Sequence, residues 1–587
     1  MNFDKAYAHI DQKDRSKRQV LMDHLIATGL SAGKQAQDLG LDKIGLLTGL
    51  LHDLGKFKDD FQEKIINSTN KRVDHSTLGA IFIKSLAETY LDDYYSNFDE
   101  EKYFVFGDYV HVLIYAIESH HGQFDFISMN KDKYFTFPSF ERINKNLNKG
   151  YGDNFFKDLS SFFKNKGFDL YDIFSKGFDQ YQAISKKIKD LARRSSKEPH
   201  ILEAEKFYQS LLIRLIISIL KSADIKDTIN SYEKIIKDSS ELSSKDLDYF
   251  EDQIDSKYQS FGIPTSPINK ARKEISDAIL KRSRKDGPGI YRLNLPTGSG
   301  KTLLSLLYGI KQMKYKERKR FFYVTSYLSV LEQNAKEIRD VIKKDQAILE
   351  HHSNVVDDQE SKDMKTLDDF DDSLDSIRKD FLKNDWTSPI ILTTMVQFFN
   401  SIFKEKSANI TRFKSMTKSV IILDELQSLP TDILYMTNLS LNFLSEIMKA
   451  TIVLSTASQP LYSSSYLNHK LIYGADNSNK DLFVLSKDQS RVFRRVSHRL
   501  LANGRQLSLD DLSDLLEKES SKSRLAILNT KASVKELYEI MRARKSYDKL
   551  YYLTTNLHAK DRLTKIGEIK KDLKDKKNIL VVSTPLN

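Results

Sequence analysis

Leu293-Asn294-Leu295-Pro296-Thr297-Gly298-Ser299-Gly300-Lys301-Thr302 lies near the middle of the chain, between an apolar segment and a leucine-rich one. The extended run 290–295 predicts a strand, and the leucine spacing in 303–310 predicts an amphipathic helix. The glycines between them permit a tight turn whose backbone N–H groups face one point, where the helix N-terminus adds positive potential. Lys301 brings a mobile charge, and Thr302 brings a hydroxyl suited to Mg²⁺. We therefore predict that residues 297–302 bind the phosphates of ATP, together with Mg²⁺.

Apolar strands alternate with helices after this loop, as a parallel α/β sheet with both faces covered requires. One of these strands, 420–423, is entirely apolar and is followed by Asp424 and Glu425. Because ligands gather at the carboxyl ends of such strands, we expect Asp424 to hold Mg²⁺ and Glu425 to orient the attacking water. Thr393 and Thr394 end another strand, where we expect their hydroxyls to meet a phosphate backbone.

Length and composition limit the classes of protein. A chain of 587 residues is too long for one core, and 40% hydrophobic residues favour globular folding. The formal net charge of +11 favours an anionic partner. The chain has no cysteine, which excludes disulfides and thiolate metal sites. The N-terminus lacks a signal-peptide core and the most apolar run, 211–220, is too short to span a bilayer, so we expect a soluble cytoplasmic protein with no membrane partner.

Histidines concentrate near the N-terminus, where seven of the 13 lie within the first 121 residues. A single histidine is more often a core or surface residue than a ligand, and we assign His111, which has apolar neighbours, to the core. The others follow a pattern at helix ends or on helix faces: His24 on a helix predicted over 17–30, His52-Asp53 ending a helix over 44–54, His75 opening a third helix, His120-His121 ending a fourth, and Asp224 after the apolar run 211–220.

This pattern indicates a metal site. Neutral imidazoles and carboxylates suit Mn²⁺, Fe²⁺, Co²⁺ or Ni²⁺, and one aspartate can bridge two ions. Two ions about 3.5–4 Å apart would activate water and stabilise the leaving oxygen of a phosphodiester. The pattern therefore favours a hydrolase.

The order of these motifs resembles the HD phosphohydrolase superfamily, and within it the nuclease domain of the type I CRISPR helicase-nuclease family. The resemblance implies an all-α domain with one metal held by His24, His52, Asp53 and Asp224, and a second, bridged through Asp53, held by His75, His120 and His121. It also implies that Lys56, in the sequence His52-Asp53-Leu54-Gly55-Lys56, faces the scissile phosphate, so Asp53 and Lys56 are candidate catalytic residues. We expect His9 to lie behind the ligands.

The motifs after residue 290 resemble superfamily-2 helicases and the same CRISPR family. Asp424-Glu425-Leu426-Gln427 matches the Asp-Glu-x-His/Gln box, whereas Ser455-Thr456-Ala457 departs from the commoner Ser-Ala-Thr. In related helicases the segment before the loop contacts the nucleotide base, which makes Asn269 and Arg272 candidates; the alternative is a solvated helix face.

These observations predict four regions: an all-α HD-type nuclease domain over 1–235, a linker over 236–266, a first RecA-like helicase lobe over 267–495, and a partial second RecA-like lobe over 496–587. The family continues beyond the strand at 579–584 with an arginine-bearing motif. We therefore expect a C-terminally truncated helicase that binds nucleotide and hydrolyses it poorly unless the missing part is supplied.

The resemblance implies a CRISPR interference effector of a prokaryotic cytoplasm: an ATP-dependent 3′→5′ single-stranded DNA translocase coupled to a two-metal HD nuclease that cleaves and degrades target DNA. Hydroxyl and amide contacts to phosphates carry no sequence information, so the resemblance assigns target choice to an RNA-guided CRISPR surveillance complex at an R-loop. One alternative is a metal-dependent HD nuclease whose helicase part is only a nucleotide- and DNA-binding docking scaffold. Another is an HD phosphohydrolase of nucleotides or small phosphoesters.

Overall fold

The chain forms two compact units, Met1–Phe493 and Arg494–Asn587. A computed structural model describes residues 5–11, 14–67, 73–122, 125–129, 135–146, 153–233, 242–352, 385–456, 462, 464, 466–474, 480–494, 496–497, 506–518 and 523–585. Ala457 of the Ser-Thr-Ala motif lies outside these residues. Within them, no helix is both long and apolar enough to cross a membrane.

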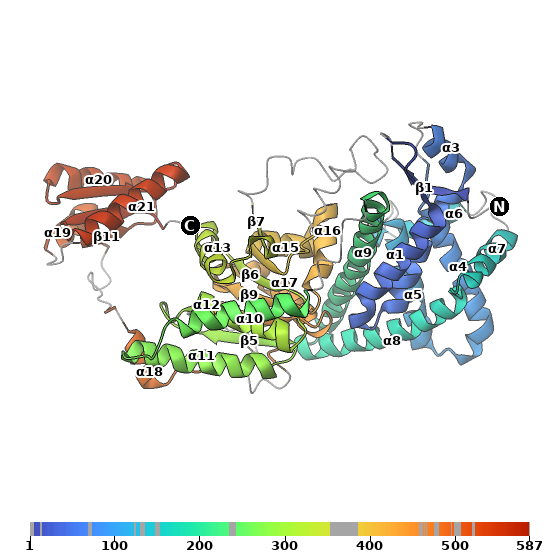
Figure 1. The fold of residues 1–587 in the computed structure, drawn as a ribbon, viewed down its shortest axis with the longest axis horizontal. Coiled ribbons are helices and arrows are strands. Elements are labelled where there is room, and N and C mark those ends of the chain that lie inside the picture. The colour runs from blue at the N-terminus through green and yellow to red at the C-terminus, as the bar shows by residue number, and fades with distance from the viewer. Residues whose placement is uncertain are drawn as a thin grey trace. The chain divides into compact units, whose positions relative to one another are not determined.

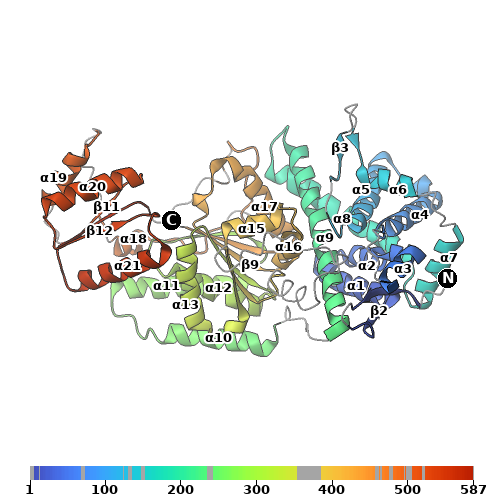
Figure 2. The same ribbon diagram turned by 90° about the horizontal axis from the view of Figure 1, so that it is seen from above.

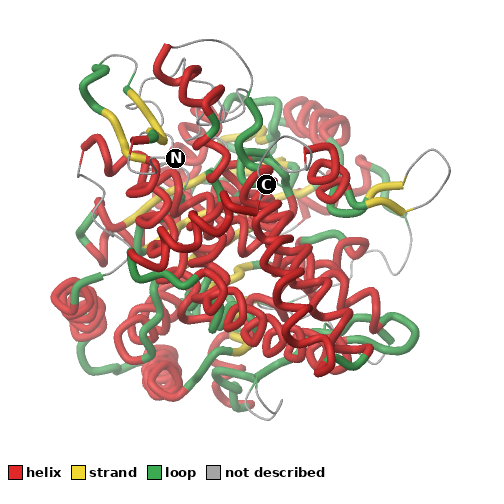
Figure 3. The backbone as a smooth tube through the Cα atoms, turned by 90° about the vertical axis from the view of Figure 1, so that its right-hand side faces the viewer, coloured by secondary structure: helices red, strands yellow, loops and turns green. Residues whose placement is uncertain are grey.

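The N-terminal part of the first unit is helical, as predicted, and faces the viewer in Figure 3. Its helices are α1 (Leu21–Ala36), α2 (Asp42–Leu51), α3 (Asp59–Asn67), α4 (Thr77–Tyr94), α5 (Glu100–Glu118), α6 (Pro138–Asn146), α7 (Asp153–Asn165), α8 (Leu170–Ser195) and α9 (Ile201–Glu233). Two short hairpins accompany them: β1 (Tyr7–Ile10) with β2 (Arg18–Val20), and β3 (Ser128–Met129) with β4 (Phe135–Thr136). The helix that carries His24 begins four residues later than predicted, because residues 18–20 pair with β1 instead.

Helix α9 lies between the N-terminal helices and the following α/β region (Figures 1 and 2). It contacts α1 and α8 on one side, and α16 (Ser407–Phe413) and α17 (Leu434–Glu446) on the other. Its buried Arg214 donates hydrogen bonds to the carbonyl of Ser401 at 3.0 Å and to that of Lys404. One continuous apolar core therefore runs from the N-terminal helices through α9 to one face of the sheet.

The sheet of the first unit has six parallel strands in the order β5-β10-β9-β6-β8-β7. The strands are β5 (Gly289–Asn294), β6 (Phe321–Thr325), β7 (Ile348–His351), β8 (Ile390–Thr394), β9 (Val420–Asp424) and β10 (Thr451–Thr456). Alternate side chains face opposite cores: Ile421 belongs to the core shared with α9, whereas Val420 and Ile422 belong to the other. This arrangement, with helices on both faces, confirms the predicted α/β region.

The second face of the sheet is covered by α10 (Ser244–Gln259), α11 (Pro267–Lys285), α12 (Lys301–Tyr315) and α13 (Leu328–Ile342). Helix α10 lies inside the predicted linker 236–266, but its Phe250 and Ile254 are fully buried in this core. This part of the linker is therefore an integral layer of the α/β region. Trp386 is also fully buried. Two further helices described in the region are α15 (Met395–Phe403) and α18 (Lys487–Phe493).

The second unit contains a parallel sheet of three strands in the order β11-β13-β12. Its elements are α19 (Leu509–Lys518), β11 (Ser523–Ile527), α20 (Lys531–Arg544), β12 (Lys549–Leu553), α21 (Ala559–Lys574) and β13 (Ile579–Ser583). The alternation of strand and helix agrees with the RecA-like pattern predicted for this part of the chain.

Candidate metal centre and nucleotide-binding loop

The seven predicted metal ligands lie together in the N-terminal helical region. They come from α1, from the turn after α2, from the segment before α4, from the end of α5 and from α9: His24, His52, Asp53, His75, His120, His121 and Asp224. Six of them are buried, and the side chain of His121 is 19% exposed. Helix packing thus brings residues up to 200 positions apart into one polar cluster inside an apolar core.

One carboxylate oxygen of Asp53, Oδ2, faces two histidines. His52 Nε2 lies 3.3 Å from it and His24 Nε2 lies 3.6 Å from it. Asp224 Oδ1 closes the group, at 3.3 Å from His24 Nε2 and 3.6 Å from His52 Nε2. These four side chains form the first half of the cluster, the half for which the sequence predicts one metal ion.

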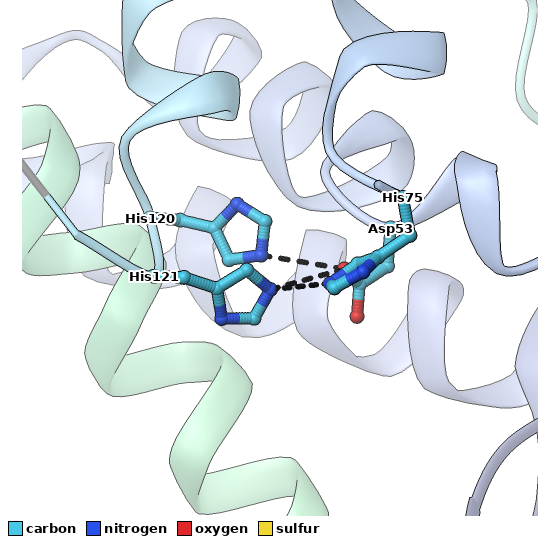
Figure 4. A group of neighbouring side chains, drawn as sticks. All are labelled: Asp53, His75, His120 and His121. Atoms are coloured by element: carbon cyan, nitrogen blue, oxygen red, sulfur yellow. Dashed lines mark hydrogen bonds and ion pairs between the residues drawn. The ribbon is translucent and has the colours of Figure 1, made fainter. Parts of the chain in front are cut away.

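The other carboxylate oxygen of Asp53, Oδ1, faces the remaining three histidines (Figure 4). The distances to it are 3.3 Å from His120 Nε2, 3.7 Å from His75 Nε2 and 3.9 Å from His121 Nε2. His75 and His121 also approach each other, with 2.6 Å between their Nε2 atoms. Asp53 therefore stands between two sets of ligands, with one oxygen directed at each.

The Nδ1 atoms of four of these histidines are held by acceptors outside the cluster. His52 Nδ1 donates to the Gly49 carbonyl at 2.9 Å, His120 Nδ1 to the Ile117 carbonyl at 2.5 Å, and His75 Nδ1 to the Val73 carbonyl at 3.2 Å. His24 Nδ1 donates to the carboxylate of Asp227 at 2.8 Å. With Nδ1 held in this way, each imidazole directs Nε2 into the cluster, and its neutral form is the tautomer that a metal ligand requires.

Asp227 is a functional candidate that sequence reasoning missed. It lies one turn after Asp224 on α9 and also accepts a hydrogen bond from Gln19 Nε2 at 2.7 Å. The spacing of three residues between the two aspartates was a usable signal, because positions three apart share one face of a helix. Asp227 fixes the ring orientation of His24, which makes it a positioning residue for the cluster.

The donor set fits metal ions. His24 Nε2, His52 Nε2, His120 Nε2, Asp53 Oδ1 and Asp224 Oδ1 are buried and have no hydrogen-bond partner among the described residues. Buried polar atoms are usually hydrogen-bonded because leaving them unsatisfied costs about 1–3 kcal/mol each. Five such atoms converging on one place suit cations that would coordinate them, and nitrogen with carboxylate oxygen suits Mn²⁺, Fe²⁺, Co²⁺ or Ni²⁺.

The charges around Asp53 keep it ionised. Burial by itself would raise the pKa of Asp53, but Lys56 and His52 hold it well below its usual value. Burial would likewise lower the pKa of His52, and the charge of Asp53 raises it to about 9. The pocket therefore favours cations.

Lys56 is buried, with Nζ 2.8 Å from Asp53 Oδ2 and 3.3 Å from His9 Nε2. It thus reaches the carboxylate that joins the two ligand sets. His9, expected behind the ligands, offers a ring nitrogen within 4.8 Å of ligand atoms of His24, Asp53 and Asp224. Its ring lies 5.3 Å from that of His24, at the edge of the first half of the cluster.

A close approach between two backbone segments explains why the His-Asp motif contains a glycine, Gly55. Its backbone N–H donates to the carbonyl of His75 at 3.0 Å. A Cβ atom at this position would lie 2.1 Å from that oxygen and 2.5 Å from the His75 Cα. Only a residue without a side chain allows the two backbones to approach this closely, and the approach sets His75 against Asp53.

The phosphate-loop residues adopt the predicted strand, turn and helix. Strand β5 ends at Asn294, and α12 begins at Lys301. Gly298 and Gly300 have φ angles of 80° and 88°, values that favour glycine. Thr297 is exposed and Ser299 is buried. The local conformation is that of a loop which presents a helix N-terminus to an anion.

The two carboxylates of the Asp-Glu box lie at the same edge of the sheet as the phosphate loop. The loop follows β5 and the box ends β9, and both strands pair in parallel with β10. Glu425 Oε1 lies 3.5 Å from Lys301 Nζ. Asp424 accepts hydrogen bonds from the Tyr323 hydroxyl at 2.7 Å and from Ser455 Oγ at 3.0 Å. Tertiary structure thus brings Lys301, at the start of α12, next to Asp424 and Glu425, at the end of β9.

Asn334 on α13 is a second residue that sequence reasoning missed. Its Oδ1 accepts from Thr302 Oγ1 at 3.0 Å, and its Nδ2 donates to the Tyr323 hydroxyl at 3.2 Å. Asn334 therefore links Thr302 to Asp424 through Tyr323, and it positions the two groups predicted to share Mg²⁺.

The expectation that Thr393 contacts a phosphate backbone is wrong. Thr393 is fully buried, and its hydroxyl donates to the His351 carbonyl of the neighbouring strand at 2.7 Å. The Thr394 hydroxyl accepts from the Gln397 N–H at 3.4 Å and caps α15. Both hydroxyls are engaged in the fold, because the end of β8 turns directly into a helix.

A cavity of about 580 Å³ adjoins the phosphate loop. Its lining includes Asn269 and Arg272, the two residues proposed for base contact, together with Tyr258 and Phe261 from the end of α10 and the segment after it. Arg272 Nε donates to the Gly298 carbonyl at 3.1 Å. The cavity therefore combines aromatic side chains with groups that touch the loop, a composition suited to a purine ring.

Comparisons with known proteins match the same two regions of the chain, the N-terminal helices and the α/β region. A family model described as "HD domain" matches residues 21–133, and one described as "Type III restriction enzyme, res subunit" matches residues 266–457. The CRISPR-associated nuclease/helicase Cas3 of Methanothermobacter thermautotrophicus is 25% identical over 311 residues, 51% of this chain and 35% of that protein. The Cas3 protein of Haloferax volcanii is 26% identical over 208 residues, 32% of this chain and 22% of that protein. The chain thus spans about a third or less of these curated relatives.

The fold is similar to that of T. fusca Cas3. The crystal structure of that protein with ATP matches 99% of this chain and 69% of its own length, with a TM-score of 0.54 and 13% identity. A second T. fusca Cas3 crystal structure has a TM-score of 0.53 at the same coverage and identity. At this identity the likeness establishes the fold alone, an α-helical HD region followed by a parallel-sheet helicase region.

Proposed function

We propose that this chain, which is a Cas3-type HD-helicase by its domains and its homologues, hydrolyses phosphodiesters of single-stranded DNA at the His/Asp cluster and binds ATP with Mg²⁺ at the phosphate loop. The nuclease reaction uses two divalent ions from the group Mn²⁺, Fe²⁺, Co²⁺ and Ni²⁺. ATP hydrolysis moves the chain along the strand in the 3′→5′ direction. The substrate is delivered by an RNA-guided CRISPR surveillance complex that exposes a single strand at an R-loop.

The position of Asp53 carries the nuclease part of this proposal. Its two oxygens face two separate ligand sets, with His24 and His52 on one side and His120 on the other at 3.3–3.6 Å. A carboxylate between two sets of buried donors suits two neighbouring ions, which supply Lewis acidity for attack on phosphorus and for departure of the leaving oxygen. A single-ion phosphoesterase has no need of the second set.

The chain's own residues orient this chemistry. Asp227 and three backbone carbonyls fix the imidazole rings, so the Nε2 atoms are preorganised. Lys56, next to Asp53, places a positive charge beside the ligands, where it attracts the phosphate of the strand. His121, the most exposed of the ligands, marks the side from which the strand enters.

In the α/β region, Lys301 neutralises the nucleotide phosphates and the backbone N–H groups of residues 298–300 hold them. Thr302 and Asp424, joined through Asn334 and Tyr323, are placed to share Mg²⁺. Glu425, beside Lys301, is the candidate that orients water.

The nuclease part is tested with circular single-stranded DNA in the presence of Mn²⁺, Co²⁺ or Ni²⁺. Asp53→Asn should abolish cleavage while the thermal unfolding profile of the apoprotein stays cooperative. Asp92→Asn, an exposed carboxylate on α4, is the matched control and should cleave as wild type. Full cleavage by Asp53→Asn, or hydrolysis of free nucleotides with no cleavage of the circle, would overturn the assignment.

The ATP-binding part is tested separately, by fluorescent-nucleotide binding and by ATPase assays with and without single-stranded DNA. Lys301→Ala should lose nucleotide binding and leave cleavage of the circle intact, because the two sites are built from different domains. Translocation assays on single strands that carry a block at either the 3′ or the 5′ end assign the polarity. A 3′→5′ motor moves toward the 5′ end, so it should stop at a block placed there.

A further inference from the structure

A second group of metal-ligating side chains lies at the opposite end of α9 from the nuclease cluster. His200, Glu203 and His469 each offer one ligand atom, and these three atoms all lie within 4.8 Å of one another. Glu203 precedes Asp224 by 21 residues on the same helix, which corresponds to about 32 Å at 1.5 Å per residue. The group is therefore separate from the cluster around Asp53.

The group joins two domains of the first unit. His200 and Glu203 belong to the segment that opens α9, whereas His469 comes from a segment after β10 of the helicase lobe. The two segments are held in register by backbone hydrogen bonds, Lys197 N–H to the Asn468 carbonyl at 3.0 Å and Lys470 N–H to the Ser195 carbonyl at 2.7 Å. The ligands therefore rest on a preformed antiparallel bridge between Ser196 and His469.

His469 is oriented as a ligand. Its side chain is 4% exposed, and its Nδ1 lies 2.8 Å from Ser196 Oγ. The other ring nitrogen, Nε2, points to the Glu203 carboxylate, with 3.6 Å between Nε2 and Oε2. A metal-binding histidine uses one nitrogen for a fixed hydrogen bond and the other for the ion, and His469 has this arrangement.

The spacing of the donors suits a tetrahedral ion. Donors about 2.1 Å from a tetrahedral ion lie about 3.4 Å from one another. Glu203 Oε2 lies 3.1 Å from His200 Nδ1 and 3.6 Å from His469 Nε2, on either side of that value. The side chains of His200 and Glu203 are 34% and 55% exposed, so an ion has a path from solvent and a fourth position open to water.

We propose that His200, Glu203 and His469 bind one divalent transition-metal ion, Zn²⁺ or an ion of like coordination chemistry, and that this ion clasps the HD domain to the first helicase lobe. Two imidazoles and one carboxylate form a donor set that binds Zn²⁺ in other proteins. The competing explanation is an ordinary ion pair between His200 and Glu203, three residues apart on the first turn of a helix. That explanation leaves the orientation of His469, from another domain, without a role.

The test measures bound metal in the full chain without nucleotide, after equilibrium dialysis against Zn²⁺ and separately against Co²⁺. Glu203→Gln removes the central donor at an exposed position, and Glu205→Gln, two residues later on α9, is the matched control. The background carries Asp53→Ala, which removes the carboxylate shared by both halves of the nuclease cluster, and any ion still held there is common to all the variants and is subtracted. In that background we expect the clasp to bind one ion with tetrahedral Co²⁺ absorption, Glu203→Gln to weaken binding at least tenfold, and Glu205→Gln to leave it unchanged.

Two further readouts separate a clasp from an adventitious surface site. Zn²⁺ should raise the midpoint of thermal unfolding of the Asp53→Ala protein, since it binds only when the two domains are docked, and Glu203→Gln should remove the rise. His200→Gln should act in the same way as Glu203→Gln. Binding that survives both substitutions, or binding with no effect on unfolding, would overturn the proposal.

Discussion

Replacing Gly55 with alanine tests how the backbone near the His-Asp motif holds His75 against Asp53. The new Cβ would lie 2.1 Å from the His75 carbonyl oxygen and 2.5 Å from its Cα. Ordinary contacts begin at about 3.4 Å, so the two segments must separate by about 1 Å or more. Both contacts are with backbone, and no side-chain rotation can relieve them.

The expected magnitude follows from the geometry of the ligands. Metal–ligand distances tolerate about 0.2 Å, and His75 Nε2 already lies 3.7 Å from Asp53 Oδ1. A shift of 1 Å therefore removes His75 from the second ligand set, and misplacement of this size costs about 100-fold in rate. His24 and His52, on the other side of Asp53, do not depend on Gly55. We expect one ion to remain bound, the second to bind about 10–100-fold more weakly, and strand cleavage to fall about 100-fold.

Metal binding by titration calorimetry with Mn²⁺, read together with cleavage of circular single-stranded DNA, measures both effects. Gly107→Ala is the control, because a Cβ there has no neighbour within 4 Å among the described residues and lies on α5, the helix that ends at the His120-His121 pair. The control should bind two ions and cleave normally. If Gly55→Ala bound two ions with wild-type affinity, the proposal that the close approach of Gly55 to His75 positions the second ligand set would be refuted. Equal loss of both ions would show general unfolding instead.

Three other changes have defined outcomes. Asp227→Asn weakens the hold on His24 and should lower metal affinity about 10–100-fold, measured by the same titration, and unchanged affinity would contradict its positioning role. Glu251→Gln removes a 2.8 Å ion pair from Lys311, a lysine 1% exposed, and should lower the free energy of unfolding by about 1.5–3 kcal/mol, visible in chemical denaturation. Burial would raise the pKa of Glu251, but Lys311 and further donors lower it to about 2, so this stabilisation should be complete above pH about 4.5 and fade as the pH falls toward 2, with Glu251→Gln showing a flatter profile. Lys301→Ala should abolish nucleotide-dependent stabilisation in thermal unfolding while the metal titration stays unchanged.

Much of the local structure could be predicted from residues close together in the chain. Strand β5, the two glycines with positive φ and helix α12 lie within residues 289–315, and their conformations follow from apolar spacing and turn chemistry. The same holds for the alternation of strands and helices in both α/β regions. The resemblance of motif order named the seven residues of the metal cluster, and helix packing brings those seven together.

The orientation of side chains depended on contacts between distant segments. Asp227 holds His24 across 203 positions, and Asn334 reaches Thr302 across 32. The Thr393 hydroxyl is buried because the neighbouring strand β7 offers it an acceptor, the His351 carbonyl.

The sequence by itself determined which residues are candidates for the chemistry: the phosphate loop, the Asp-Glu box and the histidines with Asp53 and Asp224. The tertiary structure decided how they are used, because the direction of a side chain is set by the helices and strands packed against it. It placed the two oxygens of Asp53 toward different ligands, made α10 part of the helicase lobe, and brought His469 to Glu203 at the domain boundary. These contacts join residues tens to hundreds of positions apart, and no local pattern specifies them.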